Sequence, residues 1–161
     1  MNFFTSSTFR KNLDSLTKKS REGYMSVTKD ICKALTEMTD NVLRDTNDRV
    51  RQLQDYRIVK LRLPNSGQKL SKSNGFRLIY WVSLLSNDVV LLSVYPKRGP
   101  QSAVDLVDSE YGRLVEEMTN ESIAHALHQV DIDNDLAELN QNACLSGKKG
   151  SGNTCESSMN E

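Results

Sequence analysis

The sequence has little of what marks a disulfide-bonded, metal-binding or membrane protein. The 161 residues include three cysteines, which show neither the close spacing of metal ligands nor an even framework (Cys32, Cys144 and Cys155). No apolar run approaches the length that spans a bilayer. The opening residues lack the basic start and the apolar core of a signal peptide. We therefore expect a cytoplasmic protein with reduced thiols, no metal and no membrane partner.

Motifs for common kinds of enzyme chemistry are also scarce. The two histidines, His125 and His128, stand in one late segment without an evident third metal ligand, so surface positions suit them better than a metal site. No glycine-rich loop is placed to hold phosphate groups, and the glycines between residues 147 and 152 belong to a low-complexity tail. The sequence therefore predicts no cofactor, and any chemistry has to come from cations.

The net charge is zero, but the charge is unevenly distributed along the chain. From Tyr56 to Arg98 there is one acid, Asp88, against eight cations: Arg57, Lys60, Arg62, Lys69, Lys72, Arg77, Lys97 and Arg98. From Asp105 to Glu138 there are ten acids and one cation. A localised basic segment is typical of a protein that binds a phosphate backbone.

Two amphipathic helices are predicted in the first third of the chain. Ser6 to Lys19 begins with candidate N-cap residues and places its apolar residues on one face. From Ser26 to Leu43 apolar residues recur every three or four positions, and Cys32 lies beside this stripe as a small core residue. We expect the two helices to form an antiparallel hairpin.

Three strands are predicted in the middle of the chain. Tyr56 to Leu63 alternates toward its end between apolar and basic residues, as a half-buried strand does. Phe76 to Leu84 and Val89 to Tyr95 are rich in β-branched, aromatic and leucine residues. They flank the polar break Ser86-Asn87-Asp88, which predicts a β-hairpin. The segment from Asp45 to Asp55 remains ambiguous.

The hairpin register determines which side chains meet. Pairing around Asn87 would place Tyr80 near Val94 and Arg77 near Lys97. The cations at the start of the first strand and after the second would then lie at one end of one sheet.

The remaining pattern completes an α+β fold. Helical periodicity returns over Ala103–Thr119, and a shorter helix is expected over Glu121–Gln129. We expect an N-terminal helical hairpin packed on a small, mostly antiparallel sheet, with a C-terminal helix. Residues 1–120 would form this domain, residues 121–146 an acidic, helix-compatible C-terminal extension, and residues 147–161 a disordered tail.

A rim of cations can cleave RNA without a metal. The 2′-hydroxyl must be polarised, the charge on phosphorus stabilised and the leaving 5′-oxygen neutralised. Guanidinium forks onto two phosphoryl oxygens, and a lysine crowded by other cations has a lowered pKa that suits proton transfer. A tyrosine such as Tyr80 or Tyr95 could stack on a base or donate a proton. We expect RNA contacts from Lys60, Arg62, Lys69, Lys72 and Tyr80.

The motifs Gly75-Phe76-Arg77-Leu78-Ile79-Tyr80, Val90-Leu91-Leu92-Ser93-Val94-Tyr95 and Lys97-Arg98 resemble the RelE superfamily of bacterial toxins, including its HigB branch. The similarity covers about Tyr56 to Met118. It implies a RelE-like fold and metal-independent cleavage of messenger RNA at the ribosome. It also implies a cognate antitoxin protein as partner, and a basic strand residue at Lys60 or Arg62. Arg77 matches the strand arginine of the family's site, and Lys97 and Arg98 match its basic position after the next strand. Together with Tyr95 they form the expected catalytic set.

Two departures from the family pattern bear on catalysis. Val104 stands at the interval where RelE has a tyrosine, and Pro96 stands where many members have glycine. Two alternatives stay open: a ParE-like toxin that inhibits DNA gyrase, and a catalytically silent RelE-fold binding protein. The presence of Arg77 together with Lys97 and Arg98 favours the endoribonuclease.

Overall fold

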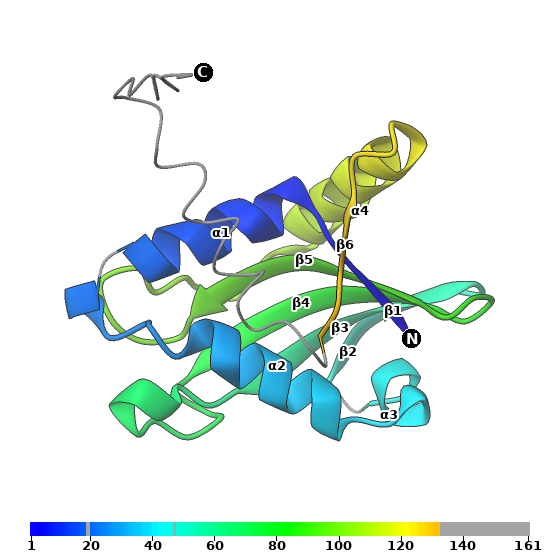
Figure 1. Ribbon diagram of the computed structural model, residues 1–161. Helices are drawn as coiled ribbons and strands as arrows, with labels where there is room; N and C mark the ends of the chain where they lie inside the picture. Colours follow the sequence, from blue (N-terminus) through cyan, green and yellow to red (C-terminus); the bar gives the residue numbers. More distant parts are fainter. Residues whose placement is uncertain (19, 47, 133–161) are drawn as a thin grey trace, which may run out of the picture.

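The computed structural model describes residues 1–18, 20–46 and 48–132 of the chain. This part folds as an α+β structure with four α-helices and one six-stranded sheet (Figure 1). In chain order the elements are β1 (Asn2–Thr5), α1 (Ser7–Lys18), a 3-10 turn (Ser20–Glu22), α2 (Val27–Glu37), α3 (Asp40–Arg44), β2 (Arg49–Gln52), β3 (Tyr56–Leu63), a second 3-10 turn (Ser66–Gln68), β4 (Phe76–Ser83), β5 (Asp88–Pro96), α4 (Asp108–Ile123) and β6 (His128–Val130). No helix within these residues is both long and apolar enough to cross a membrane.

The sheet has the strand order β2-β3-β4-β5-β1-β6. All neighbouring strands run antiparallel except β1 and β5, which pair in parallel from Asn2 opposite Asp88 to Thr5 opposite Leu91. The mostly antiparallel sheet is therefore confirmed. The strands predicted for the middle of the chain are β3, β4 and β5, whereas β1, β2 and β6 were not predicted.

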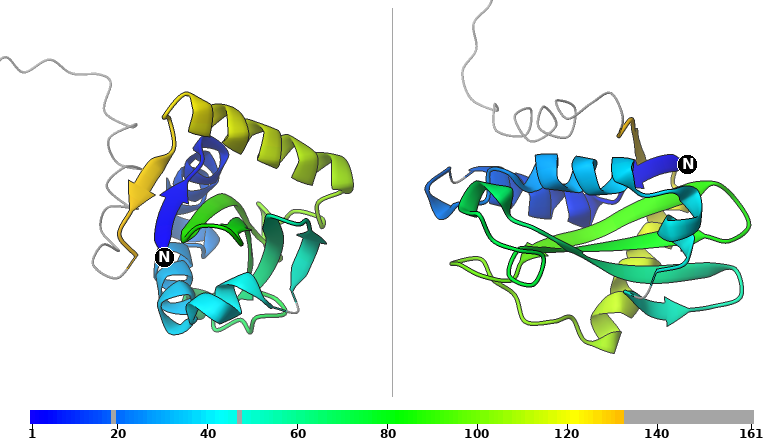
Figure 2. Two further views of the ribbon diagram at one scale, coloured as in Figure 1. Left: turned by 90° about the vertical axis from the view of Figure 1, so that its right-hand side faces the viewer. Right: turned by 90° about the horizontal axis from the view of Figure 1, so that it is seen from below.

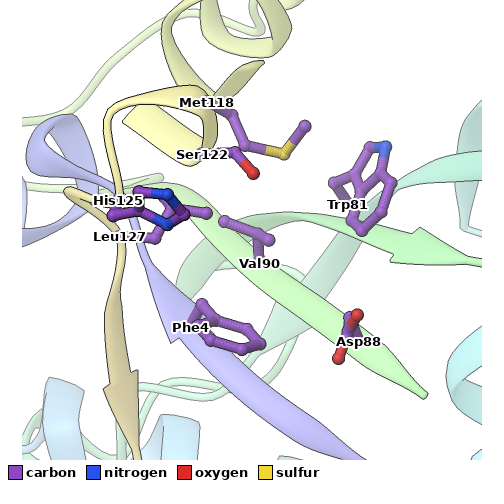
Figure 3. Close-up of a pocket in the computed structure, with 8 residues that line it drawn as sticks. All are labelled: Phe4, Trp81, Asp88, Val90, Met118, Ser122, His125 and Leu127. Atoms are coloured by element: carbon purple, nitrogen blue, oxygen red, sulfur yellow. The ribbon is translucent and has the colours of Figure 1, made fainter. Parts of the chain in front are cut away.

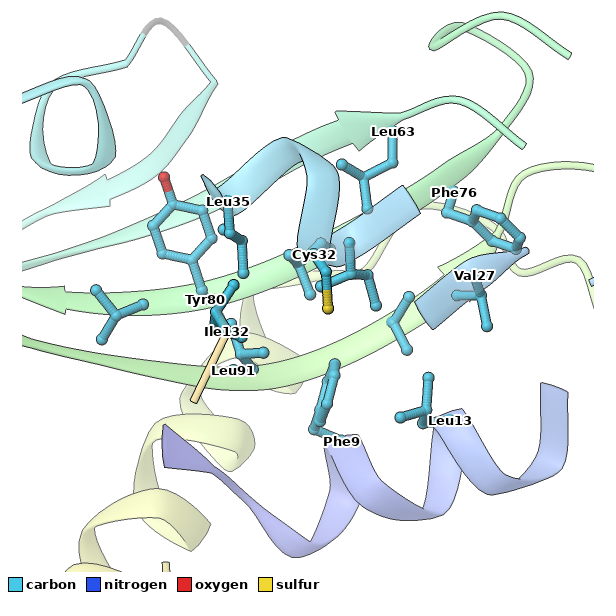
Figure 4. Close-up of a cluster of buried hydrophobic side chains, with 14 of the residues drawn as sticks. Phe9, Leu13, Val27, Cys32, Leu35, Leu63, Phe76, Tyr80, Leu91 and Ile132 are labelled. Carbon is cyan, nitrogen blue, oxygen red and sulfur yellow. The ribbon is translucent and has the colours of Figure 1, made fainter. Parts of the chain in front are cut away.

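Helices cover both faces of the sheet, with α1 and α2 on one face and α4 on the other (Figure 2). Side chains alternate along β4, so that Phe76 and Tyr80 join the core under α1 and α2 while Ile79 joins the core under α4. Figure 4 shows the first of these cores, with Cys32 buried in it as predicted. Because both faces are covered, β4 and β5 are apolar almost throughout.

The single helix predicted over Ser26–Leu43 is wrong, because the chain breaks between α2 and α3. Met38 is extended, and the Thr39 side chain then caps a new helix by accepting from the Val42 N–H at 3.3 Å. The break turns Leu43 into the core and leaves Val42 about half exposed. That α1 and α2 form an antiparallel hairpin stays a prediction.

The predicted hairpin register is also wrong. Arg77 lies opposite Tyr95 rather than Lys97, and Tyr80 lies opposite Leu91 rather than Val94, with an irregularity between Ile79 and Tyr80. Asn12 of α1 supports the irregular stretch of β5. Its amide oxygen accepts from Ser93 Oγ at 2.9 Å and from the Val94 N–H at 3.3 Å.

The predicted helices after Pro100 are shifted. The Glu110 carboxylate accepts from the Val107 N–H at 2.9 Å, and α4 begins at Asp108 rather than Ala103. The helix continues to Ile123, past the predicted domain boundary at residue 120. In place of a helix over Glu121–Gln129, β6 pairs with β1. The predicted tail, residues 147–161, and most of the predicted extension lie outside the described residues.

Candidate cationic site

A close backbone approach fixes the end of the sheet where the cations gather. A Cβ atom added to Gly75 would lie 2.1 Å from the Leu63 carbonyl oxygen, so only glycine fits there. The Gly75 carbonyl in turn accepts from the Lys97 N–H at 2.8 Å. The ends of β3 and β5 are thereby held against the start of β4.

Two lysines and a tyrosine converge on one carboxylate at this end. The Asp105 Oδ1 atom lies 3.5 Å from Lys60 Nζ and 3.9 Å from Lys97 Nζ, and accepts from the Tyr95 hydroxyl at 3.5 Å. Lys60 belongs to β3, Tyr95 to β5, and Lys97 and Asp105 to the loop between β5 and α4. We call Lys60, Tyr95, Lys97 and Asp105, together with the adjoining Arg77, the cationic cluster.

Arg77 is placed differently from expectation. Its side chain is on the α4 face, but only 5% of the residue is exposed. The guanidinium donates to the backbone carbonyls of Lys72 and Ser73 at 3.0 Å and of Phe76 at 3.2 Å. Arg77 therefore organises the loop that leads into β4, and contributes positive charge to the cluster from beneath rather than an open fork for phosphate.

The charges set the protonation of the cluster. Burial raises the pKa of the Tyr95 hydroxyl well above its ordinary value, and nearby Tyr111 and Asp105 raise it further. For Asp105, partial burial alone would raise the pKa, but Lys60, Lys97 and Arg77 outweigh it and lower the pKa. At neutral pH Tyr95 is therefore a hydrogen-bond donor and Asp105 an anion.

The other predicted cations lie outside the cluster. Arg98 donates to the Asn74 side chain at 3.1 Å on an exposed rim. Lys69 ends the Ser66–Gln68 turn in a left-handed conformation and is exposed. Arg62 and Lys72 line a separate groove of about 350 Å³ beside α2.

Tyr80 is placed where it cannot contact RNA. It is fully buried on the face covered by α1 and α2 (Figure 4), and its hydroxyl donates to the Leu43 carbonyl at 3.0 Å. Burial also raises its pKa well above the ordinary tyrosine value. The signal was present in the sequence, because Arg77 and Tyr80 are three residues apart on one strand and so point to opposite faces.

Sequence reasoning missed Asp105. In the sequence it is the first of a long series of acids, and no motif marks it. Its position depends on the path of residues 97–107, which returns to the sheet before α4 begins; the Ala103 N–H, for example, donates to the Pro96 carbonyl at 3.2 Å. Val104, at the family's tyrosine interval, points to solvent and is 88% exposed.

No known protein family, curated protein or solved structure matches this chain. The likeness to the RelE superfamily is therefore carried only by the residues quoted above. A function has to be inferred from the cationic cluster and its surroundings.

Proposed function

We propose that the protein is a RelE-type toxin, a metal-independent endoribonuclease that cuts messenger RNA at the ribosome and is silenced by a cognate antitoxin. The observation that carries the proposal is the convergence of Lys60, Lys97 and the Arg77 charge on a single carboxylate, Asp105. These cations come from three separate segments, which a local salt bridge would not require.

A phosphate group suits this cluster as a replacement for Asp105. The two ion pairs are long, at 3.5 and 3.9 Å, and the Asp105 side chain is 51% exposed. Pairs of this kind contribute only about 0–1 kcal/mol, so a phosphate with more charge and more oxygen atoms can displace the carboxylate. Tyr95 would then donate its hydroxyl hydrogen to the same phosphate.

The cluster supplies charge and protons rather than a strong base. The lowered pKa of Asp105 makes its carboxylate a weak base, and Tyr95 stays protonated, so neither suits removal of the 2′-hydroxyl proton. The lysines and Arg77 stabilise the phosphorane as the 2′-oxygen bonds to phosphorus, and a lysine protonates the leaving 5′-oxygen. The 2′-hydroxyl must be aligned and deprotonated from elsewhere, which fits a reaction that needs the ribosome.

Induced expression of single variants tests the proposal. Lys97→Ala and Lys60→Ala should each restore growth and reduce the cleaved 5′ ends mapped on transcripts by about 10²-fold or more. Lys11→Ala is the matched control, because Lys11 is exposed on α1, on the other face of the sheet.

The same experiment separates the alternatives. Growth inhibition with intact transcripts and inhibited gyrase would contradict the proposal in favour of a ParE-like toxin. A protein without any effect on growth or transcripts would indicate a silent binding protein.

A further inference from the structure

A cavity of about 300 Å³ lies away from the cationic cluster, between the C-terminal half of α4 and the sheet (Figure 3). Phe4 of β1, Trp81 of β4, Val90 of β5 and Met118 of α4 form its apolar walls. Asp88, Ser122 and His125 add polar groups. Apolar walls with a few polar groups are typical of small-molecule sites.

Aromatic rings on two strands face this cavity. Phe4 and Trp81 are both only partly buried, and Trp81 is the one residue of β4 that is not buried. Behind it lies Tyr56, with ring centroids 5.8 Å apart and a tilt of 37° between the planes. Exposed aromatic faces of this kind hold flat rings by stacking.

A histidine just after the end of α4 has a left-handed backbone conformation. The Ala126 N–H donates to the Glu121 carbonyl at 2.8 Å, and the residue before it, His125, has φ of +53°. Glycine is favoured at such a helix end because other residues are strained there. A histidine is found instead, and its ring lines the cavity across from Trp81 (Figure 3).

The carboxylate of Asp88 decides which flat ring fits. Its two oxygens accept from Asn2 Nδ2 at 3.2 Å and from Ser86 Oγ at 2.8 Å, which leaves each oxygen a further acceptor site. A carboxylate only accepts, so a ligand must bring N–H donors to it. Cytosine, adenine and guanine offer an exocyclic amino group, whereas uracil presents carbonyl oxygens beside its single N–H.

We propose that this cavity binds an amino-bearing nucleobase (cytosine, adenine or guanine), stacked against Trp81 with its amino group toward Asp88. The inference rests on the proposed function, since a base of the bound RNA is the natural occupant. The cavity would then favour certain bases of the bound RNA, while the cationic cluster binds the cleaved phosphate.

Trp81 is the only tryptophan of the chain, so its fluorescence reports directly on the cavity. We expect saturable quenching of the full-length protein by cytidine, adenosine and guanosine, with affinity about tenfold higher than for uridine. Nucleosides carry no phosphate, so Lys97→Ala should leave these titrations unchanged while it reduces cleavage. A protein that cleaves RNA but shows no quenching would overturn the cavity proposal alone.

Variants of the polar residues complete the test. Asp88→Asn should lose the preference for cytidine over uridine, whereas Asp55→Asn, an exposed acid outside the cavity, should keep it. His125→Gly should weaken cytidine binding several-fold and also raise the melting temperature, because glycine relieves the positive φ. His128→Ala, a change at the other histidine, should do neither. Equal binding of cytidine and uridine, or unchanged binding in Asp88→Asn, would overturn the proposal.

Discussion

Arg77 acts on the cationic cluster without reaching into it. Its guanidinium is fixed by three backbone carbonyls, so the charge stays in place whether or not a phosphate is bound. Such preorganised charge is what transition-state stabilisation requires. The same bonds make Arg77 a structural residue as well, which changes what its removal would do.

Arg77→Ala is expected to lower stability as well as activity. One buried and two partly buried carbonyls lose a donor, at a cost of about 1–3 kcal/mol, which corresponds to a fall of several degrees in melting temperature. Thermal unfolding measures this. Arg98→Ala is the matched control, since Arg98 is exposed and has one side-chain bond, to Asn74. An equal loss in both variants would contradict the role assigned to Arg77.

Asp105→Asn is expected to strengthen RNA binding. Removing the carboxylate frees Lys60 and Lys97, so the affinity for a single-stranded RNA should rise about two- to fivefold, in line with the worth of weak ion pairs. The slope of log affinity against log salt should steepen by about 0.7. If the variant loses cleavage while binding is unchanged, Asp105 is a base in the reaction and not a displaceable counterion.

At the scale of elements, α1 supports the end of β5 that carries Tyr95, in its irregular register, through Asn12. The register matters because it places Tyr95, and not Lys97, opposite Arg77. A regular ladder without this irregularity would place a residue other than Tyr95 opposite Arg77. The helix and the cluster lie on opposite faces, so this support acts through the strand itself.

Asn12→Ala is expected to loosen this part of β5. The Val94 N–H loses an acceptor, at a cost of about 1–3 kcal/mol, and hydrogen exchange at Val94 should accelerate. Ser15→Ala is the control, because Ser15 lies on the same helix and its hydroxyl donates to the partly buried Gln101 side chain at 2.9 Å instead of to β5. Unchanged exchange at Val94 would show that Asn12 does not support the strand.

Among the strands, the sequence predicts those that are long enough to show a clear composition and period. β3, β4 and β5 each have eight or nine residues with clear strand composition, and they were found. β1, β2 and β6 have only three or four residues, too few for a period to show, and their pairing comes from distant strands. For the same reason the basic members of the site were predictable by type, while the position of Asp105 and the face of Tyr80 depended on register and loop path.

Across the whole molecule, two carboxylates of α4 bind the start of α1. Both oxygens of Glu121 accept from the Ser7 N–H at 3.1 Å, and Glu117 accepts from the hydroxyls of Ser7 and Thr8. Negative charge at a helix N-terminus is favourable. These bonds join the helices of the two faces around the β1 side of the sheet.

This tie predicts a loss of stability in acid. Partial burial would raise the pKa of Glu117, but the hydroxyls of Ser7 and Thr8, with Arg113 and Lys11, lower it below its ordinary 4.5. A lowered folded-state pKa gives stability that is complete above about pH 4.5 and lost as the pH falls through the folded value. In Glu117→Gln the melting temperature should depend less on pH below pH 4.5. Glu116 is exposed on the same helix, so Glu116→Gln should keep the dependence of the parent protein. Parallel acid profiles in the two variants would contradict the tie.

The parallel pairing of β1 with β5 has a consequence for synthesis. β1 leaves the ribosome before its partners, because Asn2 pairs with Asp88, 86 residues later, and β6 pairs with the other side of β1 later still. Contacts of such sequence separation form slowly, and an unpaired strand edge is open to wrong partners in the meantime. The nascent chain therefore carries an incomplete sheet until nearly all of the described residues have been made, and a partner that shields β5 during that interval would raise the yield of folded protein.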